Sequence, residues 1–406
     1  MGMRIPRSAR SAAQVLRPSR QRARRRKTLG VKHAHDFLKE IFDGRMHAAR
    51  VGSLANGVAG ALAAATASIH AMGQAYAAVA LITAKSGVKQ IDRLLSNVGF
   101  VVEEAQRQWA AFVIGGRKEV VLAMDWTDFD DDDHTTLCVY VVTNHGRATP
   151  LAWQTVLKSE LAGRRTALEH AMVMRVHEWL PPEMDIELLA DRGFGDQKLY
   201  ELLATYGWDF HIRFRGNIVV ESADGEARPA HEWLWPTGRA RMLRGARVTE
   251  DRTPIAAVVV VHARGMKEPW CIATSRKNFT AAQVVKRYGR RFTIEETFRD
   301  TKDLHFGMGL KATHIGKPAR RHRLLFLLAV AHALLTLLGA ASEATGLDRT
   351  LKVNTVKRRT HSLFRQGTYW YMCLPTMREE WFRRLMLAFD RIVREHALFR
   401  ETFGVL

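Results

Sequence analysis

The sequence is poor in cysteine, and it has no apolar run long enough to cross a bilayer comfortably. Its 406 residues include three widely spaced cysteines: Cys138, Cys271 and Cys373. This spacing argues against a disulfide framework and a cysteine-based zinc site, and it favours a reducing, cytoplasmic setting. The most apolar stretch, residues 324–338, is interrupted by a histidine and a threonine. It is short for a membrane span, so we expect a buried helix there.

Several enzyme motifs are also missing. The chain has no H-E-x-x-H pair of zinc ligands, no G-x-x-x-x-G-K-[ST] phosphate loop and no G-x-G-x-x-G dinucleotide fingerprint. It also shows no convincing Ser/His/Asp or Cys/His constellation. These absences argue against zinc proteases, P-loop enzymes, dinucleotide-dependent enzymes and hydrolases that use a covalent nucleophile.

Negative charge is scarce relative to positive charge. The chain has 62 Lys and Arg against 41 Asp and Glu, which gives a net charge of +21. A polyanion is the natural partner, and nucleic acid fits better than a membrane because no long apolar run accompanies the charge. Residues 1–27 contain many arginines and no acid. We expect a basic, disordered arm over residues 1–32; an over-extended gene start and a targeting peptide are the alternatives.

Hydrophobic residues that recur near helical spacing predict a helical DNA-binding domain over residues 33–115. Within it, the segment KSGVKQIDRLLSN has Ser86 as a candidate N-cap, followed by an apolar face. A second face is basic and carries Lys85, Lys89 and Arg93. We expect this face to contact DNA as helix-turn-helix units do. The alternative is an ordinary amphipathic surface helix.

After residue 115 the pattern changes to strands and then to alternating helices and strands. The predicted order β-β-β-α-β-α-β is that of a ribonuclease H-like fold. We therefore predict an α/β protein whose ribonuclease H-like catalytic core is interrupted by a β-rich insertion. Helical regions flank this core at both ends. The predicted domains after the N-terminal ones are the first core segment 116–215, the insertion 216–278, the second core segment 279–345 and the helical region 346–406.

The final helix of the C-terminal region places apolar residues at alternating steps of three and four. These residues are Trp381, Leu385, Phe389, Ile392, His396 and Phe399. Such a stripe is typical of helices that pair two chains, so we expect a contribution to dimerisation. Packing of the stripe onto its own domain is the alternative.

The most informative motif is Y-x2-R-x3-E-x6-K, formed by Tyr288, Arg291, Glu295 and Lys302. On a single α-helix these offsets place all four side chains within an arc of roughly 60°. A carboxylate suits a metal ion, and Arg and Lys suit phosphate oxygens. A solvated, charged helix is the alternative for this motif taken alone.

Two aspartates stand where predicted strands end. Asp125 follows the apolar run 120–124, and Asp191 follows 185–190 in LLADRGFG. The predicted strand order brings these aspartates side by side, and the next helix returns Glu295 to them. Three such carboxylates would hold two Mg²⁺ or Mn²⁺ ions about 3.5–4 Å apart, as phosphoryl transfer requires. Asp196 is the better N-cap candidate for the helix that follows.

Together, these aspartates and the Y-R-E-K motif closely resemble the DDE transposases of bacterial insertion sequences, in particular the insertion sequence four family. The resemblance covers roughly residues 120–314. It implies a cytoplasmic, nucleoid-associated enzyme that binds the double-stranded ends of its element, cleaves them by metal-dependent hydrolysis and joins the 3′-hydroxyls to target DNA. It also implies a homodimer in the synaptic complex. A ribonuclease H-like nuclease without strand joining and an inactive DNA-binding regulator are the alternatives.

The resemblance further implies residue roles. Asp125, Asp191 and Glu295 would be the catalytic metal ligands. Tyr288, Arg291 and Lys302 would contact transposon-end DNA near the scissile phosphate. Trp270, on the last predicted strand of the insertion, would stack on a flipped base, with a place in the protein core as its alternative.

Overall fold

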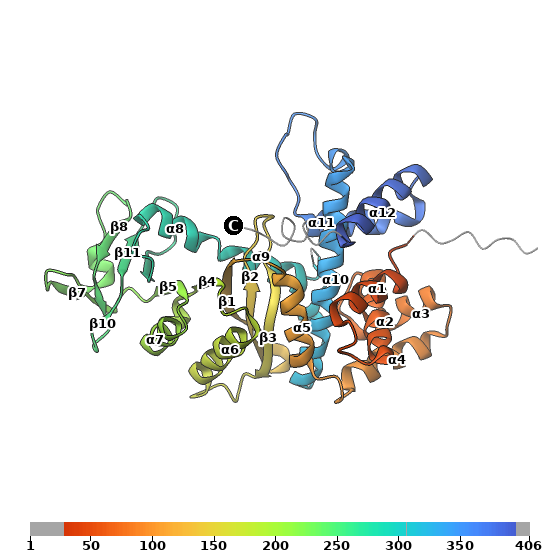
Figure 1. Ribbon diagram of the computed structural model, residues 1–406, viewed down its shortest axis with the longest axis horizontal. Coiled ribbons are helices and arrows are strands. Elements are labelled where there is room, and N and C mark those ends of the chain that lie inside the picture. The colour runs from red at the N-terminus through yellow and green to blue at the C-terminus, as the bar shows by residue number, and fades with distance from the viewer. Residues whose placement is uncertain (1–27, 306, 395–406) are drawn as a thin grey trace, which may run out of the picture.

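The computed structural model describes residues 28–305 and 307–394. A mixed sheet of eight strands forms its centre, and a small second sheet lies beyond one edge (Figure 1). Helix α10 stands between the large sheet and helices α1–α4 at the other end of the molecule (Figure 1). Most of residues 1–32, predicted as a basic arm, lies outside the described residues.

The large sheet has the order β3-β2-β1-β4-β5-β12-β11-β8. Its strands, in chain order, are β1 (Glu119–Phe129), β2 (His134–Val141), β3 (Thr149–Leu157), β4 (Asp185–Ala190), β5 (Asp209–Phe214), β8 (Arg241–Arg244), β11 (Ala257–Val261) and β12 (Trp270–Thr274). β4 runs parallel to both β1 and β5, and the other pairs are antiparallel. Two helices connect the parallel strands, α6 (Arg165–Trp179) and α7 (Gln197–Thr205). The observed element order from β1 to β5 is the predicted one.

β1 is longer than its apolar run suggests. The prediction ended the strand at Asp125, but β1 continues to Phe129 because β2 pairs with it residue by residue as far as His134. The connecting turn is therefore confined to residues 130–133, where Asp133 takes a left-handed conformation with φ of 52°. Asp125 thus lies inside β1, where it pairs with Cys138 of β2 and has paired residues before and after it.

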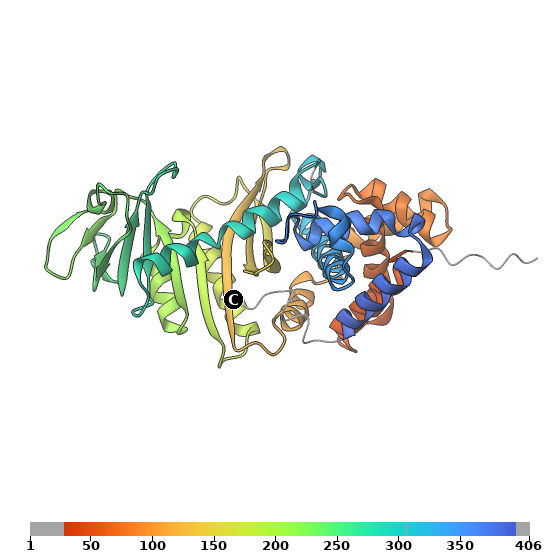
Figure 2. The ribbon, with the colours of Figure 1, turned by 90° about the horizontal axis from the view of Figure 1, so that it is seen from above.

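Residues 216–278, predicted as a β-rich insertion, contribute strands to both sheets. β8, β11 and β12 extend the large sheet, since β12 pairs with β5. The remaining strands form the small sheet in the order β10-β9-β6-β7. They are β6 (Val219–Glu221), β7 (Ala227–Pro229), β9 (Arg247–Val248) and β10 (Thr253–Pro254). The chain then returns across the large sheet through α8 (Ala281–Gly289) and α9 (Phe292–Lys302), as Figure 2 shows.

The helical regions from the two ends of the chain pack together around α10 (Pro318–Ala344). The N-terminal helices are α1 (Val31–Phe42), α2 (Ala48–Ala64), α3 (Ile69–Ala80), α4 (Ala84–Ser96) and α5 (Val102–Ile114). The C-terminal helices are α11 (Leu363–Cys373) and α12 (Glu379–Arg394). Within the described residues, α10 is the one helix long and apolar enough to cross a membrane, yet 89% of its most apolar window is buried inside the fold. The prediction of a buried helix over residues 324–338 is confirmed.

Two local predictions need correction or completion. α4 begins at Ala84, with Thr83 as its N-cap; the predicted cap, Ser86, instead donates its backbone N–H to the Thr83 hydroxyl at 3.2 Å. In α12, the predicted apolar stripe is buried at Leu385, Phe389 and Ile392, within the same chain. The two last residues of that stripe lie outside the described residues.

Helices α10 and α11 approach closely because glycines stand at their crossing. A Cβ added at Gly367 would overlap the carbonyl oxygen of Leu335, and one added at Gly339 would overlap that of Leu363. No side chain larger than hydrogen fits at either position without separating the helices. The crossing joins the C-terminal region to the central helix of the fold.

We expect Gly367→Ala to lower the free energy of unfolding by about 1–3 kcal/mol, because the added methyl overpacks this crossing. Gly52→Ala is the matched control. Gly52 lies in α2, where an added Cβ would enter open space, so alanine should be neutral or stabilise the helix by up to about 1 kcal/mol. Urea denaturation followed by circular dichroism measures both. Equal stability of the two variants would contradict the close crossing.

Candidate active site

Asp125 and Asp191 lie next to each other where the parallel pairing of β1 with β4 ends. The β1–β4 register pairs Met124 with Ala190, so each aspartate is one residue further along its strand. Asp191 directly follows β4 in extended conformation. In open α/β sheets, the carboxyl ends of parallel strands are where ligands commonly bind. The structure therefore brings these two predicted site residues together.

The Y-R-E-K motif lies on two helices, and the prediction of a single helix over residues 288–302 is wrong. α8 ends at Gly289 and α9 begins at Phe292. Glycine is a poor helix former. At the junction the backbone N–H groups bond to the carbonyl three residues earlier instead of four. Arg291 N–H donates to the Tyr288 carbonyl at 2.9 Å. Because Arg291 keeps right-handed helical backbone angles, the motif still faces the sheet.

Arg291 connects two of the predicted metal ligands. Its Nη1 donates to Oδ2 of Asp125 at 2.8 Å, and its Nη2 donates to Oε1 of Glu295 at 2.6 Å. The Arg291 side chain is 5% exposed, whereas that of Glu295 is 49% exposed. Burial alone would lower the pKa of Arg291, but the surrounding phenol and carboxylates outweigh it and raise that pKa. The guanidinium is thus a permanent cation between two carboxylates.

Asp125 is held in a mostly buried position. Burial raises its pKa to about 6, despite the opposing effect of Arg291. The negative charge of Asp191 adds to the rise, and the backbone N–H of Trp126, which donates to Oδ1 at 2.9 Å, opposes it. The carboxylate is therefore poorly solvated, and a cation that approaches it competes with little water.

Tyr288 and Arg213 flank Asp191. The Tyr288 hydroxyl donates to Oδ1 of Asp191 at 3.3 Å, and Nη1 of Arg213 lies 3.8 Å from the same oxygen. Burial raises the pKa of Tyr288, so the phenol keeps its proton. Trp270 packs edge-on against Tyr288 with ring centroids 5.0 Å apart, and it is partly exposed. Trp270 therefore lies beside the site, because its ring contacts Tyr288, which donates a hydrogen bond to Asp191.

Lys302 reaches the same edge of the sheet from the end of α9. Its Nζ donates to the Thr127 hydroxyl at 3.0 Å and to the Asp128 carbonyl at 2.8 Å. Burial lowers the pKa of Lys302. Thr127 lies two residues after Asp125 on β1, so this ammonium is on the same strand face as the carboxylate. All four residues of the motif thus meet the sheet near the two aspartates.

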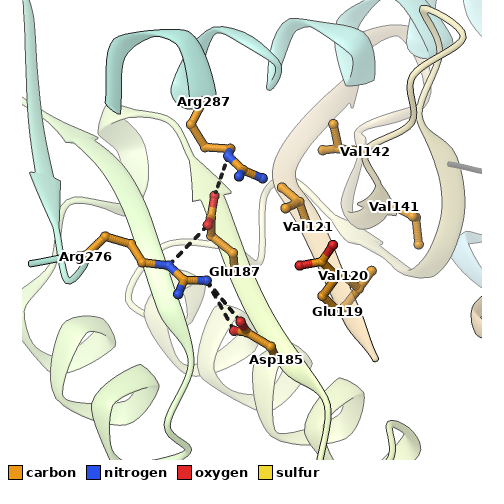
Figure 3. Close-up of a pocket in the computed structure, with 9 residues that line it drawn as sticks. All are labelled: Glu119, Val120, Val121, Val141, Val142, Asp185, Glu187, Arg276 and Arg287. Carbon is orange, nitrogen blue, oxygen red and sulfur yellow. Dashed lines mark hydrogen bonds and ion pairs between the residues drawn. The ribbon is translucent and has the colours of Figure 1, made fainter. Parts of the chain in front are cut away.

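An ionic network fixes α8 on the sheet (Figure 3). Glu187, buried on β4, lies 3.4 Å from Nε of Arg287 on α8 and 3.5 Å from Nε of Arg276. Burial favours the neutral acid, but His211 and the two arginines outweigh it and lower the pKa of Glu187. Arg276 also binds Asp185 at 3.2 Å, beside a cavity of about 50 Å³. Because Arg287 precedes Tyr288, this network sets where the phenol meets Asp191.

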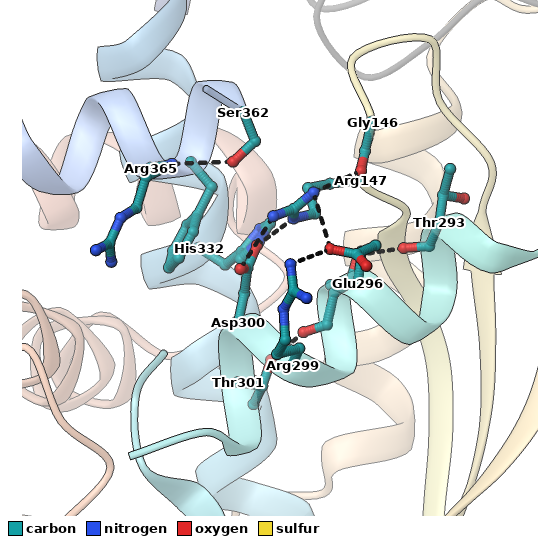
Figure 4. A network of polar contacts seen from close by, with 12 residues as sticks. Gly146, Arg147, Thr293, Glu296, Arg299, Asp300, Thr301, His332, Ser362 and Arg365 are labelled. Atoms are coloured by element: carbon teal, nitrogen blue, oxygen red, sulfur yellow. Dashed lines mark hydrogen bonds and ion pairs between the residues drawn. The ribbon is translucent and has the colours of Figure 1, made fainter. Parts of the chain in front are cut away.

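A second network fixes α9 from its other side (Figure 4). Arg147, in the loop before β3, binds Asp300 through Nε at 2.5 Å and Nη2 at 3.3 Å. The Asp300 side chain is 5% exposed. The Thr297 hydroxyl accepts the backbone N–H of Ala148 at 2.8 Å. These contacts hold the helix that carries Glu295 against the β2–β3 connection.

The carboxylates are chemically suited to Mg²⁺ or Mn²⁺, which prefer oxygen ligands. Within the described residues, no three His, Cys, Asp or Glu side chains gather closely enough to hold one ion. Arg291 explains this, since it occupies the space between Asp125 and Glu295. Asp125 and Asp191 still fit such an ion, because Mg²⁺ is often bound by one or two carboxylates together with substrate phosphates and water.

The predicted basic face of α4 is separate from this site. Lys85, Lys89 and Arg93 are exposed. Their helix, α4, lies among the N-terminal helices on the far side of α10 from the large sheet (Figure 1). Conversely, sequence reasoning missed Arg213 and Glu187. Arg213 lies on β5, the strand that neighbours β4, and a basic residue in that strand was the available signal. Glu187 lies four residues before Asp191 on the same strand face, and a charged residue inside an apolar strand run was its signal.

Comparison with known proteins gives one family match. Residues 165–334 match the model of the transposase DDE domain. This segment begins after β1 and includes β4, β5, α8 and α9. No curated protein matches the chain. The match supports a DDE transposase, an enzyme that acts on DNA.

Proposed function

We propose, from this domain match together with the carboxylate geometry, that the protein is a cut-and-paste DNA transposase of the insertion sequence four family. It binds the double-stranded ends of its element, hydrolyses them and joins the 3′-hydroxyls to target DNA. The observation that carries the proposal is that Asp125 and Asp191 each directly follow the last residue pair of the parallel strands β1 and β4, with Glu295 connected to Asp125 through Arg291. The strand order β3-β2-β1-β4-β5 supports a ribonuclease H-like core.

In this proposal Asp125 and Asp191 hold the divalent cations, two Mg²⁺ or Mn²⁺ ions. Bound there, such ions activate the attacking oxygen and stabilise the leaving oxygen of an in-line displacement. Tyr288 orients the Asp191 carboxylate through its hydroxyl. The largely buried setting of Asp125 keeps water from competing for it. This reaction needs no covalent nucleophile from the protein.

Arg291 and Lys302 bind phosphate oxygens of the DNA end. Arg291 already makes one charge-assisted hydrogen bond to each of two carboxylates, and a guanidinium can bind a single phosphate through two of its N–H groups. Exchange of a carboxylate for a phosphate releases Glu295, which is half exposed, to act as the third ligand. Binding of the DNA end and assembly of the three-carboxylate metal site then happen together.

The proposal also includes a homodimer, because transposition holds two DNA ends together. The described part of the α12 stripe is buried within its own chain, and a contribution of the C-terminal region to dimerisation stays a prediction. Trp270, partly exposed beside Tyr288, is placed to stack on an unpaired base at the cleaved end.

Strand joining tests the function. We expect the full chain, incubated with Mg²⁺, a supercoiled plasmid and pre-cut duplexes copied from the DNA that flanks its gene, to give duplex–plasmid joints. Gel electrophoresis of labelled duplexes detects them, and EDTA should abolish them. Hydrolysis of the duplexes without joints would favour the nuclease alternative, and binding without either reaction would favour the inactive regulator.

A further inference from the structure

We infer that Glu268, in the turn between β11 and β12, is a positioning residue that keeps Asp191 available to a divalent cation. It does so by holding the guanidinium of Arg213 away from the Asp191 carboxylate. The inference rests on the proposed function and deepens it, because it adds a residue to the part of the site that binds the metal ions.

Arg213 lies between two carboxylates and makes a close ion pair with one of them. Its Nη2 lies 3.0 Å from Oε1 of Glu268 and donates to the Pro269 carbonyl at 3.1 Å. Its Nη1 lies 3.8 Å from Oδ1 of Asp191, which is beyond hydrogen-bonding distance. The Arg213 side chain is 11% exposed, so solvent ions screen its charge weakly. Arg213 is therefore bound by Glu268 and is only close to Asp191.

A guanidinium hydrogen-bonded to Asp191 would compete with a metal ion. It would occupy a lone pair of the carboxylate and neutralise the charge that attracts the cation. Arg291 makes such contacts with Asp125 and Glu295, at 2.8 and 2.6 Å. Asp191 instead accepts a hydrogen bond from the neutral Tyr288 hydroxyl at 3.3 Å, and among the residues that the structure describes no cation donates one to its side chain. Asp191 thus lacks the hydrogen-bonded cation that Asp125 has.

Glu268 binds both arginines that lie beside Asp191. Arg192, the residue after Asp191, donates from Nη1 to Oε2 of Glu268 at 2.8 Å. The other oxygen of Glu268, Oε1, faces Arg213. Each arginine therefore has a carboxylate partner other than Asp191. Without that partner, the guanidinium of Arg213 would turn to the carboxylate of Asp191, 3.8 Å away.

The large sheet orders the backbone that carries these groups. β12 pairs with β5, and the register places Ile272 opposite Arg213. Glu268 lies two residues before β12 begins, and Pro269 between them has a fixed φ. Because the backbone at Glu268 is ordered in this way, it adds little to the entropic cost of the ion pair with Arg213.

Binding of Mn²⁺ alone to the full chain, without DNA, tests the inference. Electron paramagnetic resonance of the free ion measures the affinity, and Asp191→Asn sets the background. We expect Glu268→Gln to bind Mn²⁺ roughly 5-fold more weakly than wild type, the effect of one partly exposed ion pair, because Arg213 then turns to Asp191. Glu226→Gln is the matched control. It removes another exposed glutamate, which pairs with Arg228 at 3.3 Å, and it should leave the affinity unchanged.

A double-mutant cycle separates positioning from the simple loss of one negative charge. Arg213→Met should change the Mn²⁺ affinity by less than about twofold in wild type, where Glu268 holds the arginine, and should restore about 5-fold in Glu268→Gln. Arg213→Gln replaces it in the cycle if circular dichroism shows that Arg213→Met is unfolded. Equal effects in both backgrounds, an unchanged affinity of Glu268→Gln, or no Mn²⁺ binding by wild type would overturn the inference. Strand joining by wild type, measured separately, would still leave the proposed function standing.

Discussion

Asp191→Asn is expected to abolish strand cleavage, lowering its rate by about 10³-fold or more, while DNA affinity stays within about twofold. The amide keeps the shape of the side chain and can still accept a hydrogen bond from Tyr288. It loses the negative charge that holds a divalent cation in the proposed function, and such a cation contributes several kcal/mol to the transition state. Cleavage of labelled duplexes in Mg²⁺ and binding in EDTA separate the two effects.

Asp196→Asn is the matched control for this experiment. Asp196 lies five residues further along the same connection and caps α7, where it accepts the backbone N–H of Lys198 at 3.1 Å. Asparagine caps helices as well as aspartate does, so both folding and cleavage should be unchanged. If Asp191→Asn still cleaves at the wild-type rate, or if both variants lose cleavage together, the metal-ligand role of Asp191 is wrong.

Arg147→Met is expected to lower the free energy of unfolding by roughly 3–5 kcal/mol. It removes the arginine partner of Asp300 and leaves a buried carboxylate with only His332, 3.9 Å away, beside it. Cleavage should also slow, because the network in Figure 4 holds α9 and therefore Glu295. Urea denaturation measures the stability. The cleavage assay measures the rate, which should fall if α9 is displaced.

The control is Arg299→Met on the same helix. Arg299 is 55% exposed and pairs with Glu296, which is 40% exposed. An exposed pair of this kind contributes about 0–1 kcal/mol. Equal destabilisation by the two substitutions would contradict the special role of the Arg147–Asp300 contact.

The Arg147 effect should also depend on pH. Burial raises the pKa of Asp300 on its own, but His332 and Arg147 outweigh burial and hold it below the usual value. A depressed folded pKa gives stability that is present above the unfolded pKa of about 3.9 and is lost as the pH falls through the folded pKa. The difference between wild type and Arg147→Met should therefore shrink below about pH 4.

Local patterns predicted much of the scaffold. Short apolar runs ending in aspartate indicated the strands that carry Asp125 and Asp191, and the strand order placed these residues together. Periodicity indicated the buried helix that became α10. Such features depend on neighbours in the sequence, where hydrophobic spacing is informative.

Long-range contacts were not predictable in the same way. Nothing local indicates that Arg147 binds Asp300, 153 residues away, or that β12 pairs with β5. The break between α8 and α9 was also missed; it is slight, since Arg290 and Arg291, the two residues between the helices, keep right-handed helical backbone angles. From the sequence, Arg291 was predicted only to contact DNA near the scissile phosphate. Its contact with Asp125 could not be predicted, because it forms only when the sheet and the helices pack together.

The pairing of β12 with β5 has a mechanical consequence. The eight strands from β3 to β8 form one hydrogen-bonded sheet. It includes β1 with Asp125, β12 with Trp270, and β4, which Asp191 directly follows. A module tethered by loops can swing towards its substrate, whereas here any hinge motion between Trp270 and the aspartates would have to break the contacts of β12 with β5. The pairing therefore holds Trp270 at a fixed distance from the two aspartates, and in the proposed complex a DNA end would have to fit that spacing.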